Sequence, residues 1–224
     1  YRRQRQMCIR DRGVIYRAKA GVVRKIIETD RLQILGLHNY ENVMAATAMA
    51  ESFGVPMDVI VEVLERFQAV EHRIEYVVEK RGVKFYNDSK GTNPDAAIQG
   101  IRAMNRPTFL IGGGYDKESE YDEWIEAFDG KVKKLVLIGQ TRDKIAACAR
   151  KHGFTEIAFA DSLEEAIDIC YENAVSGDAV LLSPACASWG MFDNYEQRGD
   201  LFKEYARSLK AVSYTHLTLP TIRL

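Results

Sequence analysis

Seven consecutive residues, Asn87-Asp88-Ser89-Lys90-Gly91-Thr92-Asn93, bring together a carboxylate, an ammonium group and two hydroxyls. They follow an apolar alternating run, and Asn93-Pro94 favours a helix start with Asn93 as N-cap and proline at the first helical position. Because backbone N–H groups at a helix start attract anions, the segment suits a phosphate or a carboxylate. The alternative is a polar strand–helix loop in which Asn93 is only a cap.

Two other segments have a composition that allows close approach to a ligand. Glycines 112–114 precede Lys117, so the backbone can come near a bound group while the lysine supplies a point charge. The alternative is a glycine turn with a solvated lysine. Residues 183–188 read Ser-Pro-Ala-Cys-Ala-Ser. Cys186 has no base beside it in sequence, which favours small-residue packing over a nucleophile.

The elements that must position these segments alternate between strand and helix. A hairpin is expected around Gly82, followed by short apolar strands near residues 108–111, 135–138, 157–159 and 180–182 with helices between them. This pattern predicts an open, mostly parallel, Rossmann-like α/β sheet with helices on both faces and an N-terminal antiparallel hairpin. Ligands bind beyond the carboxyl ends of such strands, so segments 88–93, 112–117 and 183–188 should line one crevice.

Two helices are expected before the hairpin. The first would start with Asn39 as its cap and end at Gly54, and Pro56 would open the second. Apolar side chains at helical spacing predict a buried face on the second helix, composed of Val59, Ile60, Val63, Leu64 and Phe67. Further on, Ser162 and Glu165 have the spacing of a capping box.

Composition excludes several classes of protein. The formal net charge is −1, but residues 13–211 alone carry 25 basic and 31 acidic side chains and show no basic stripe, which disfavours a nucleic-acid partner. Four widely spaced cysteines indicate neither a disulfide framework nor a zinc motif, and they suit a reducing cytoplasm. Apolar runs are too short to span a bilayer. We expect a cytoplasmic monomer with no membrane partner.

Both ends are expected to be foreign to the fold. Met7 to Arg12 and Val212 to Thr221 resemble translated sequencing-adapter sequence rather than natural protein. Residues 1–12 and 212–224 are therefore predicted to be non-native tails and are left out of the fold prediction.

Four motifs, in order, resemble those of the D-glutamate-adding Mur ligases of bacterial cell-wall synthesis. Residues 87–93 resemble the DSKATN motif, with Gly91 where alanine is usual. Residues 36–42 (GLHNYEN) resemble a G-x-HN-x-x-N motif that ends the central ATPase domain, and residues 71–75 (EHRIE) resemble an HR-x-E linker motif. Residues 182–198 resemble the LSPACAS-x-D-x-F-x-N-F-x-x-RG signature, although Trp189-Gly190 replaces x-D and Tyr195 replaces phenylalanine.

The resemblance implies a peptidoglycan-precursor ligase. ATP would activate an alanyl carboxylate of UDP-N-acetylmuramoyl-L-alanine as an acyl phosphate, and the amine of D-glutamate would attack it. Thr92 and Lys117 would bind one carboxylate of D-glutamate, while Ser188, with Trp189 next to it, and the backbone at Tyr195 would bind the other. Lys90 would be the catalytic cation at the reaction centre.

On the nucleotide side, the resemblance implies that Asn39 and Asn42 contact the adenine of ATP. Arg73 would contact the phosphates, with His72 beside it, and Asp88 would lie at the ribose or its surroundings. Residues 13–69 would be the C-terminal, helical remnant of the central ATP-binding domain, and residues 70–211 the amino-acid-binding domain.

No G-x-x-x-x-G-K-[ST] loop occurs in the sequence. We therefore expect Mg²⁺ ligands mainly in an upstream part of the parent enzyme and no turnover by this chain alone. Two alternatives stay open: a stand-alone Rossmann-like nucleotide- or amino-acid-binding module, and another Mur or folylpolyglutamate-type ligase.

Overall fold

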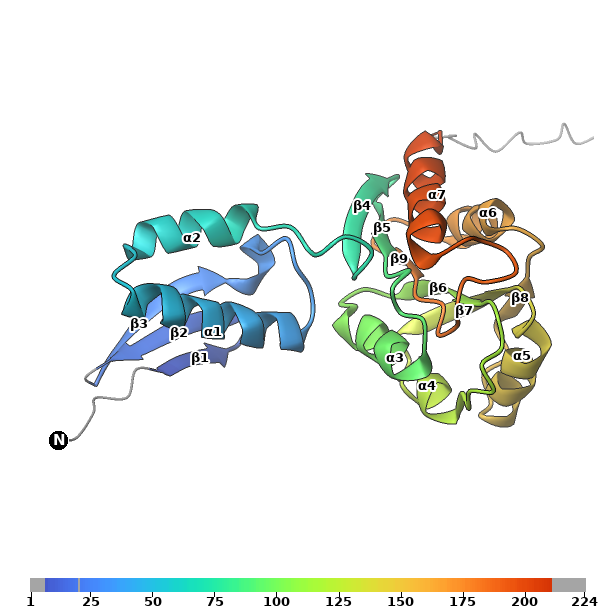
Figure 1. The fold of residues 1–224 in the computed structure, drawn as a ribbon, viewed down its shortest axis with the longest axis horizontal. Coiled ribbons are helices and arrows are strands. Elements are labelled where there is room, and N and C mark those ends of the chain that lie inside the picture. The colour runs from blue at the N-terminus through green and yellow to red at the C-terminus, as the bar shows by residue number, and fades with distance from the viewer. Residues whose placement is uncertain (1–6, 20, 211–224) are drawn as a thin grey trace, which may run out of the picture.

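The chain folds into two units joined by a linker. The computed structural model describes residues 7–19 and 21–210, which form an N-terminal unit (residues 7–69) and a C-terminal domain (residues 72–210) (Figure 1). Within these described residues, no helix is both long and apolar enough to cross a membrane. The proposed tail at residues 212–224 and residues 1–6 of the other tail lie outside the described residues.

The N-terminal unit packs two helices on a three-stranded antiparallel sheet of order β1-β2-β3 (Figure 1). Its elements are β1 Met7–Asp11, β2 Val14–Lys19, β3 Val22–Glu28, the short 3-10 helix η1 Thr29–Arg31, α1 Leu37–Ser52 and α2 Met57–Arg66. The two helices were predicted, but the sheet was not. Leaving residues 7–11 out of the fold was wrong, since they form an ordered edge strand paired with β2 from Met7 opposite Ala18 to Asp11 opposite Val14.

Helix α1 begins earlier than the sequence indicates. Gly36 is its N-cap with φ +98°, so Asn39 lies inside the first turn, and the prediction that Asn39 caps the helix is wrong. Its side-chain Nδ2 instead donates a hydrogen bond to the backbone oxygen of Leu35 at 2.7 Å. The predicted buried face of α2 is also largely wrong. Ile60 is buried, whereas Val59, Val63 and Phe67 are exposed.

The C-terminal domain contains a six-stranded sheet of order β4-β5-β9-β6-β7-β8. Strands β4 and β5 form the predicted antiparallel hairpin, and the other neighbouring strands pair in parallel. Its elements are β4 Glu75–Lys80, β5 Val83–Asn87, α3 Pro94–Ala103, β6 Thr108–Gly113, α4 Asp122–Glu126, β7 Val132–Ile138, α5 Arg142–Lys151, β8 Ile157–Phe159, α6 Leu163–Asn173, β9 Ala179–Leu182 and α7 Tyr195–Ser208. The predicted open α/β fold is confirmed.

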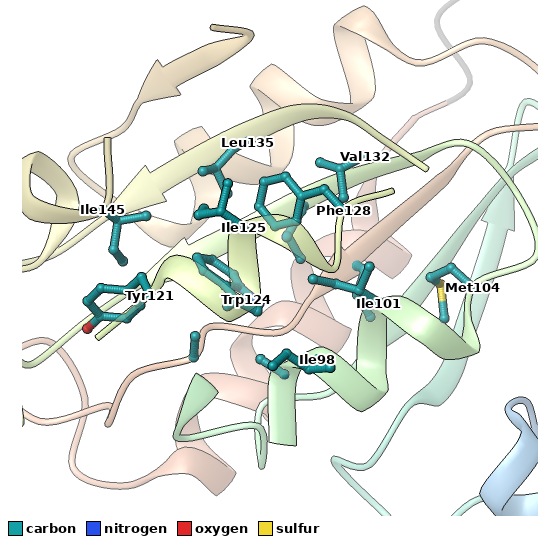
Figure 2. Packing of buried hydrophobic residues seen from close by; sticks show 14 of the residues in the cluster. Ile98, Ile101, Met104, Tyr121, Trp124, Ile125, Phe128, Val132, Leu135 and Ile145 are labelled. Atoms are coloured by element: carbon teal, nitrogen blue, oxygen red, sulfur yellow. The ribbon is translucent and has the colours of Figure 1, made fainter. Parts of the chain in front are cut away.

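Alternating strand residues build a hydrophobic core on each face of this sheet. On one face, Leu110 and Leu135 pack with the apolar sides of α3, α4 and α5, around the buried ring of Trp124 (Figure 2). On the other face, Phe109 and Val136 pack with α6 and α7. Because central parallel strands are covered on both sides, they read as continuous apolar runs in the sequence.

Side-chain caps fix where three of these helices start. Asn93 Oδ1 accepts from the Ala96 amide at 2.9 Å, with Pro94 in the first helical position, as predicted. Asn194 caps α7 in the same way. The capping box of α6 is only half formed. Ser162 Oγ accepts from the Glu165 amide, but the Glu165 carboxylate accepts from the amide of Asp161 rather than from that of Ser162.

Candidate functional site

The three polar segments meet at the carboxyl edge of the sheet. Strands β5, β9 and β6 are neighbours, so the loops that follow them leave the sheet side by side. Ser183 Oγ donates to Asp88 Oδ2 at 2.7 Å, and the Gly113 amide donates to Pro184 O at 2.8 Å. Tyr115 also forms an antiparallel bridge with Ala187. The prediction that segments 88–93, 112–117 and 183–188 come together is confirmed.

Asp88 connects this edge to the linker between the two units. Its Oδ2 accepts from Ser183, and its Oδ1 accepts from the backbone amide of Ile74 at 3.3 Å. The carboxylate is almost fully buried, and burial raises its pKa to about 7, although both hydrogen bonds and the charges of Arg73 and Arg198 oppose the rise. Asp88 thus joins the linker at Ile74 to the β9 loop at Ser183.

Lys90 lies in a short stack of side chains. Its Nζ is 5.4 Å from the centre of the Tyr195 ring, and that ring meets His72 edge-on with 5.8 Å between ring centres. The Lys90 amide donates to the His72 carbonyl at 3.0 Å, and Ser89 Oγ donates to the Tyr195 carbonyl at 2.7 Å. Lys90, Tyr195 and His72, which the sequence analysis assigned to the site, therefore lie close together. They come from three separate segments of the chain.

The linker enters this stack in an unusual backbone conformation. His72 and Ile74 have φ of +62° and +49°, a region that a β-branched residue such as Ile74 rarely adopts. Asn87 Nδ2 lies 3.0 Å from His72 Nδ1 and 3.1 Å from Glu75 Oε2. With Asn87 as the donor, His72 Nδ1 is the acceptor and Nε2 carries the proton. His72 is thus held as a packed, oriented residue between linker and α7.

Arg198 is a residue that the sequence analysis did not assign to the site. Its guanidinium is 1% exposed, donates to Ser89 Oγ at 2.9 Å and to Ser89 O at 2.8 Å, and reaches the Cys186 carbonyl at 3.2 Å. Burial lowers its pKa to about 10. The arginine ends the fourth motif, which was the available signal. From α7, the Arg198 side chain joins the loop after β5 to the loop after β9. This role depends on burial, which the sequence does not reveal.

Lys117 and Trp189 form a second group at the crevice. The Lys117 ammonium lies 4.7 Å from the centre of the Trp189 ring, a cation–π arrangement, and that ring meets Tyr115 edge-on. Trp189 is 53% exposed, whereas Ser188 before it is buried. The amides of residues 191 and 192 donate to Ser188 O and close a turn in which Gly190 has φ +83°. The turn is therefore held despite the replacement of the usual aspartate at 190.

Asn39, Asn42 and Arg73 line a cavity of about 310 Å³. Its other walls are apolar and come from α1, α2 and the linker, including Val43, Leu64 and Ala69. An apolar pocket with a few polar groups at its edge is typical of a binding site for a flat organic group. Three of the five residues assigned to the nucleotide side thus share one pocket, whereas His72 and Asp88 do not line it. Arg73 links the pocket to the His72 stack.

Thr92 is not joined to the Lys117 group. It is half-buried, and its amide donates to Lys90 O. No hydrogen bond shown for residues 7–19 and 21–210 connects Thr92 to Lys117 or Ser188.

Cys186 is buried under the crevice. Its Sγ lies 3.1 Å from Tyr121 Oη and 3.3 Å from Thr141 Oγ1, and burial raises the pKa of the thiol. Thr141 Oγ1 also accepts from the Gly114 amide. These contacts agree with the packing interpretation of Cys186 and tie the glycine loop to α5.

A second cavity, of about 570 Å³, lies between the N-terminal unit and the β4–β5 hairpin. Tyr40, Tyr76, Tyr86 and Arg106 are among its lining residues. It contains none of the residues assigned to a site from the sequence.

Two proteins with high sequence identity to this chain carry the same enzyme name. The UDP-N-acetylmuramoylalanine–D-glutamate ligase of Lachnoclostridium phytofermentans is 59% identical over 209 residues, which is 92% of this chain and 45% of that protein. The enzyme of that description from Lachnospira eligens is 64% identical over 178 residues, covering 80% of this chain and 40% of its own length. The chain therefore spans less than half the length of these curated relatives.

Solved structures support the same fold at low identity. The UDP-N-acetylmuramate-alanine ligase of Thermotoga maritima matches with a TM-score of 0.59 and 18% identity over 88% of this chain and 44% of that one. A Mycobacterium tuberculosis folylpolyglutamate synthase complexed with ADP has a TM-score of 0.59 at 17% identity, over 92% of this chain and 48% of that one. The family model described as Mur ligase, glutamate ligase domain, matches residues 72–186, about half of the chain. The chain therefore belongs to the Mur ligase family.

Proposed function

We propose that this chain provides the D-glutamate side of the active site of a UDP-N-acetylmuramoylalanine–D-glutamate ligase, together with the adenine-facing edge of its ATP site. One observation carries the proposal. The loops bearing Lys90, Lys117 and Ser188 meet at one sheet edge, and Arg73 connects that edge to a mainly apolar pocket with two asparagines. Such an arrangement suits an anionic amino acid on one side and a nucleobase on the other.

The proposal divides the chain as the motifs suggest. Residues 70–211 form the amino-acid-binding domain, and residues 13–69 are the C-terminal part of the central ATP-binding domain. Residues 1–12 and 212–224 are non-native in sequence by this proposal, although residues 7–11 pair with β2. The linker at His72 and Ile74 is then the junction between the two halves of the active site.

D-glutamate carries two carboxylates, so it needs two anion clamps. Lys117 and Thr92 hold one carboxylate in this proposal. Ser188 and the backbone N–H of Tyr195 hold the other, with Trp189 beside them. Tyr195 is the first residue of α7, so its N–H is among the helix-start donors that have no partner inside the helix. With both carboxylates fixed, the amine of the substrate is directed at the activated carbonyl, and such orientation contributes up to about 7 to 11 kcal/mol.

The reaction forms an amide. The unprotonated amine of D-glutamate attacks the carbonyl carbon of an acyl phosphate of UDP-N-acetylmuramoyl-L-alanine, a C–N bond forms, and the C–O bond to phosphate breaks as the amine loses a proton. Lys90 offsets the negative charge that builds on the oxygens during this step. Because Lys90 packs on the Tyr195 ring, the same residue that starts α7 also positions the catalytic cation.

Mur ligases use ATP, and the pocket residues fit it. The side-chain amides of Asn39 and Asn42 can both donate and accept, which matches the edge of adenine, and Arg73 can pair with phosphate oxygens. His72, packed and oriented, positions Arg73, and Asp88 lies within the same hydrogen-bonded surroundings. ATP supplies the phosphoryl group that activates the carboxylate, and we expect the Mg²⁺ ligands in a part of the enzyme outside this chain.

Steady-state kinetics on a ligase of the relatives' full length that contains this sequence would test the assignment. We expect Lys117→Ala and Thr92→Ala to raise the KM for D-glutamate at least about tenfold, because each removes a hydrogen bond to a charged group, and to leave the KM for ATP within about twofold. Asn39→Ala should instead raise the KM for ATP and leave the KM for D-glutamate within about twofold. Lys131→Ala, a lysine outside the crevice, is the matched control.

Equal changes in both KM values for the Lys117 and Thr92 variants would contradict the assignment. Preference of the unmodified enzyme for another amino acid would favour a different Mur or folylpolyglutamate-type ligase. Ligand binding without amide formation in the presence of all three substrates would favour a binding module.

A further inference from the structure

A cluster of potential metal ligands lies between helices α4 and α5, and it shares no residue with the crevice. Asp122 is the first residue of α4, and Cys148 and His152 stand four residues apart near the end of α5. In a helix, residues at i and i+4 point to the same side. The two helices pack through the core around Tyr121, Trp124 and Ile145, which fixes how they face each other (Figure 2).

The three side chains converge on one point. A carboxylate oxygen of Asp122, Cys148 Sγ and a ring nitrogen of His152 all lie within 4.8 Å of one another. His152 Nε2 is 2.8 Å from Asp122 Oδ1. Ligand atoms around a tetrahedral ion with bonds of about 2.0 to 2.3 Å lie roughly 3 to 4 Å apart, so only small side-chain adjustments are needed.

The donor set selects the type of ion. One sulfur, one imidazole nitrogen and one carboxylate oxygen suit borderline ions such as Zn²⁺ rather than Mg²⁺ or Ca²⁺, which prefer oxygen alone. The other ring nitrogen of His152, Nδ1, faces Glu126 Oε1 at 3.7 Å. A carboxylate behind the second nitrogen is the usual way in which metal-binding histidines are oriented.

Charges in the cluster show what an ion would replace. Lys151 Nζ lies 3.0 Å from Asp122 Oδ1, and its side chain is 73% exposed, so the ammonium can move into solvent when a cation arrives. Cysteine binds a metal as the thiolate, so an ion must displace the proton of Cys148 when it binds.

We propose that Asp122, Cys148 and His152 form a binding site for a borderline divalent cation of the Zn²⁺ type, with a fourth position open to water. The ion would join the start of α4 to the end of α5. Asp122 directly follows Tyr121, whose hydroxyl lies 3.1 Å from Cys186 Sγ beneath the crevice. The site would therefore stabilise the segment that leads from Lys117 into α4.

Cobalt and zinc binding by the full 224-residue chain tests the proposal. Co²⁺ should produce a thiolate charge-transfer band, and Zn²⁺ should abolish it and raise the Tm, since binding to the folded state alone stabilises that state. Cys148→Ala should eliminate the band, and His152→Ala should weaken Zn²⁺ binding by at least about tenfold. Cys8→Ala is the matched control for another half-buried cysteine and should change neither.

Lys151→Ala separates a metal site from a simple ion-pair cluster. Removing the competing ammonium should tighten Zn²⁺ binding at pH 8, whereas a cluster without an ion site would show no such gain. A Co²⁺ band that persists in Cys148→Ala, or Zn²⁺ affinity that is the same in His152→Ala and the unmodified chain, would overturn the proposal. None of these variants touches a residue assigned to D-glutamate or ATP, so the result is independent of the proposed ligase activity.

Discussion

The N-terminal unit and the C-terminal domain bury their apolar residues to very different degrees. The C-terminal sheet has a core on each face, and its central strands are buried throughout. In the N-terminal unit a small cluster around Ile15 and Ile27 is buried, while Phe53 is 87% exposed and Met49 is 61% exposed. The difference indicates that the C-terminal domain is stabilised by its own core, whereas the N-terminal unit is only partly so.

The two regions also hold their polar groups differently. In the C-terminal domain, Asp88 and Arg198 are buried and fasten loops together. The N-terminal unit has ion pairs at its surface, such as Arg66 with Glu62. Its contribution to the site is a pocket rather than a buried network, and Asn42 on that pocket is exposed. The proposed amino-acid side is therefore more buried than the proposed nucleotide side.

The largest expected effect comes from a matched pair of phenylalanines. Phe85 is fully buried against Tyr171 and Phe202, so Phe85→Ala should lower the free energy of unfolding by about 3 to 5 kcal/mol. Phe53→Ala should change it by less than about 0.5 kcal/mol. Urea unfolding followed by tryptophan fluorescence is the measurement for Phe85, because both tryptophans, Trp124 and Trp189, lie in the C-terminal domain.

Far-UV circular dichroism follows the N-terminal unit in the same titration. A loss of more than about 1 kcal/mol in Phe53→Ala would show that α1 buries Phe53 in solution. That result would remove the contrast between the two regions.

Asp88 should make the stability of the C-terminal domain fall as pH rises. Its pKa is raised to about 7 in the folded chain, against 3.8 for the unfolded side chain, so the folded state binds more protons between those values. The free energy of unfolding should therefore decrease by on the order of 3 kcal/mol between about pH 4 and about pH 7, because each pH unit in this range contributes at most about 1.4 kcal/mol. Asp88→Asn should remove most of this decrease.

In the N-terminal unit, Glu28 should make stability depend on pH in the opposite direction. The pKa of exposed Glu28 is lowered by its hydrogen bond with Lys25, so its small contribution is present above the unfolded pKa and is lost as pH falls. Urea midpoints measured at intervals from pH 4 to 8 distinguish the two. A tryptophan-detected stability that rises across this range in the unmodified chain would contradict the role of Asp88.

Replacing Arg198 should lower the free energy of unfolding more than replacing an arginine of the N-terminal unit. Arg198→Met leaves Ser89 O and Cys186 O without a buried donor, so we expect a loss of about 2 to 3 kcal/mol, and Arg198→Lys should recover only part of it. Arg66→Met should cost about 1 kcal/mol or less, since its ion pair with Glu62 is exposed. Equal losses for the two variants in urea unfolding would contradict this difference between the two regions.

The sequence was informative where one local rule decides the structure. The strand–helix alternation, the hairpin at Gly82 and the convergence of the three loops all follow from periodicity and from the geometry of parallel sheets. Family motifs supplied the candidate site residues, and the structure brings Lys90, Tyr195 and His72 together, although their roles remain proposals.

What the sequence did not indicate depended on contacts distant in the chain. Strand β1 was missed because residues 7–11 were excluded as foreign. The pairing of β2 with β3 was also missed, although both strands lie within residues 13–69. The exposure of Phe67 and Val63 could not be read from helical spacing, since spacing shows a face but not what covers it. The burial of Arg198 was also invisible, because charged residues are usually exposed.

The smallest expected effect compares two asparagines that look alike in sequence. Asn93 caps α3 through the Ala96 amide, so Asn93→Ala should lower stability by about 1 kcal/mol. Asn39 lies inside α1, where Gly36 is the cap, and its amide only donates to the Leu35 carbonyl. Asn39→Ala should therefore change stability by about 0.5 kcal/mol or less.

Thermal unfolding of the two variants measures both effects, and Asn93→Asp gives the control, because aspartate caps a helix about as well as asparagine. If Asn39→Ala were as destabilising as Asn93→Ala, α1 would start at Asn39 in solution. In that case Asn39 could not present its amide to the pocket as proposed, because a capping side chain turns back to its own helix. The comparison thus tests whether Asn39 is placed to contact the nucleotide as proposed.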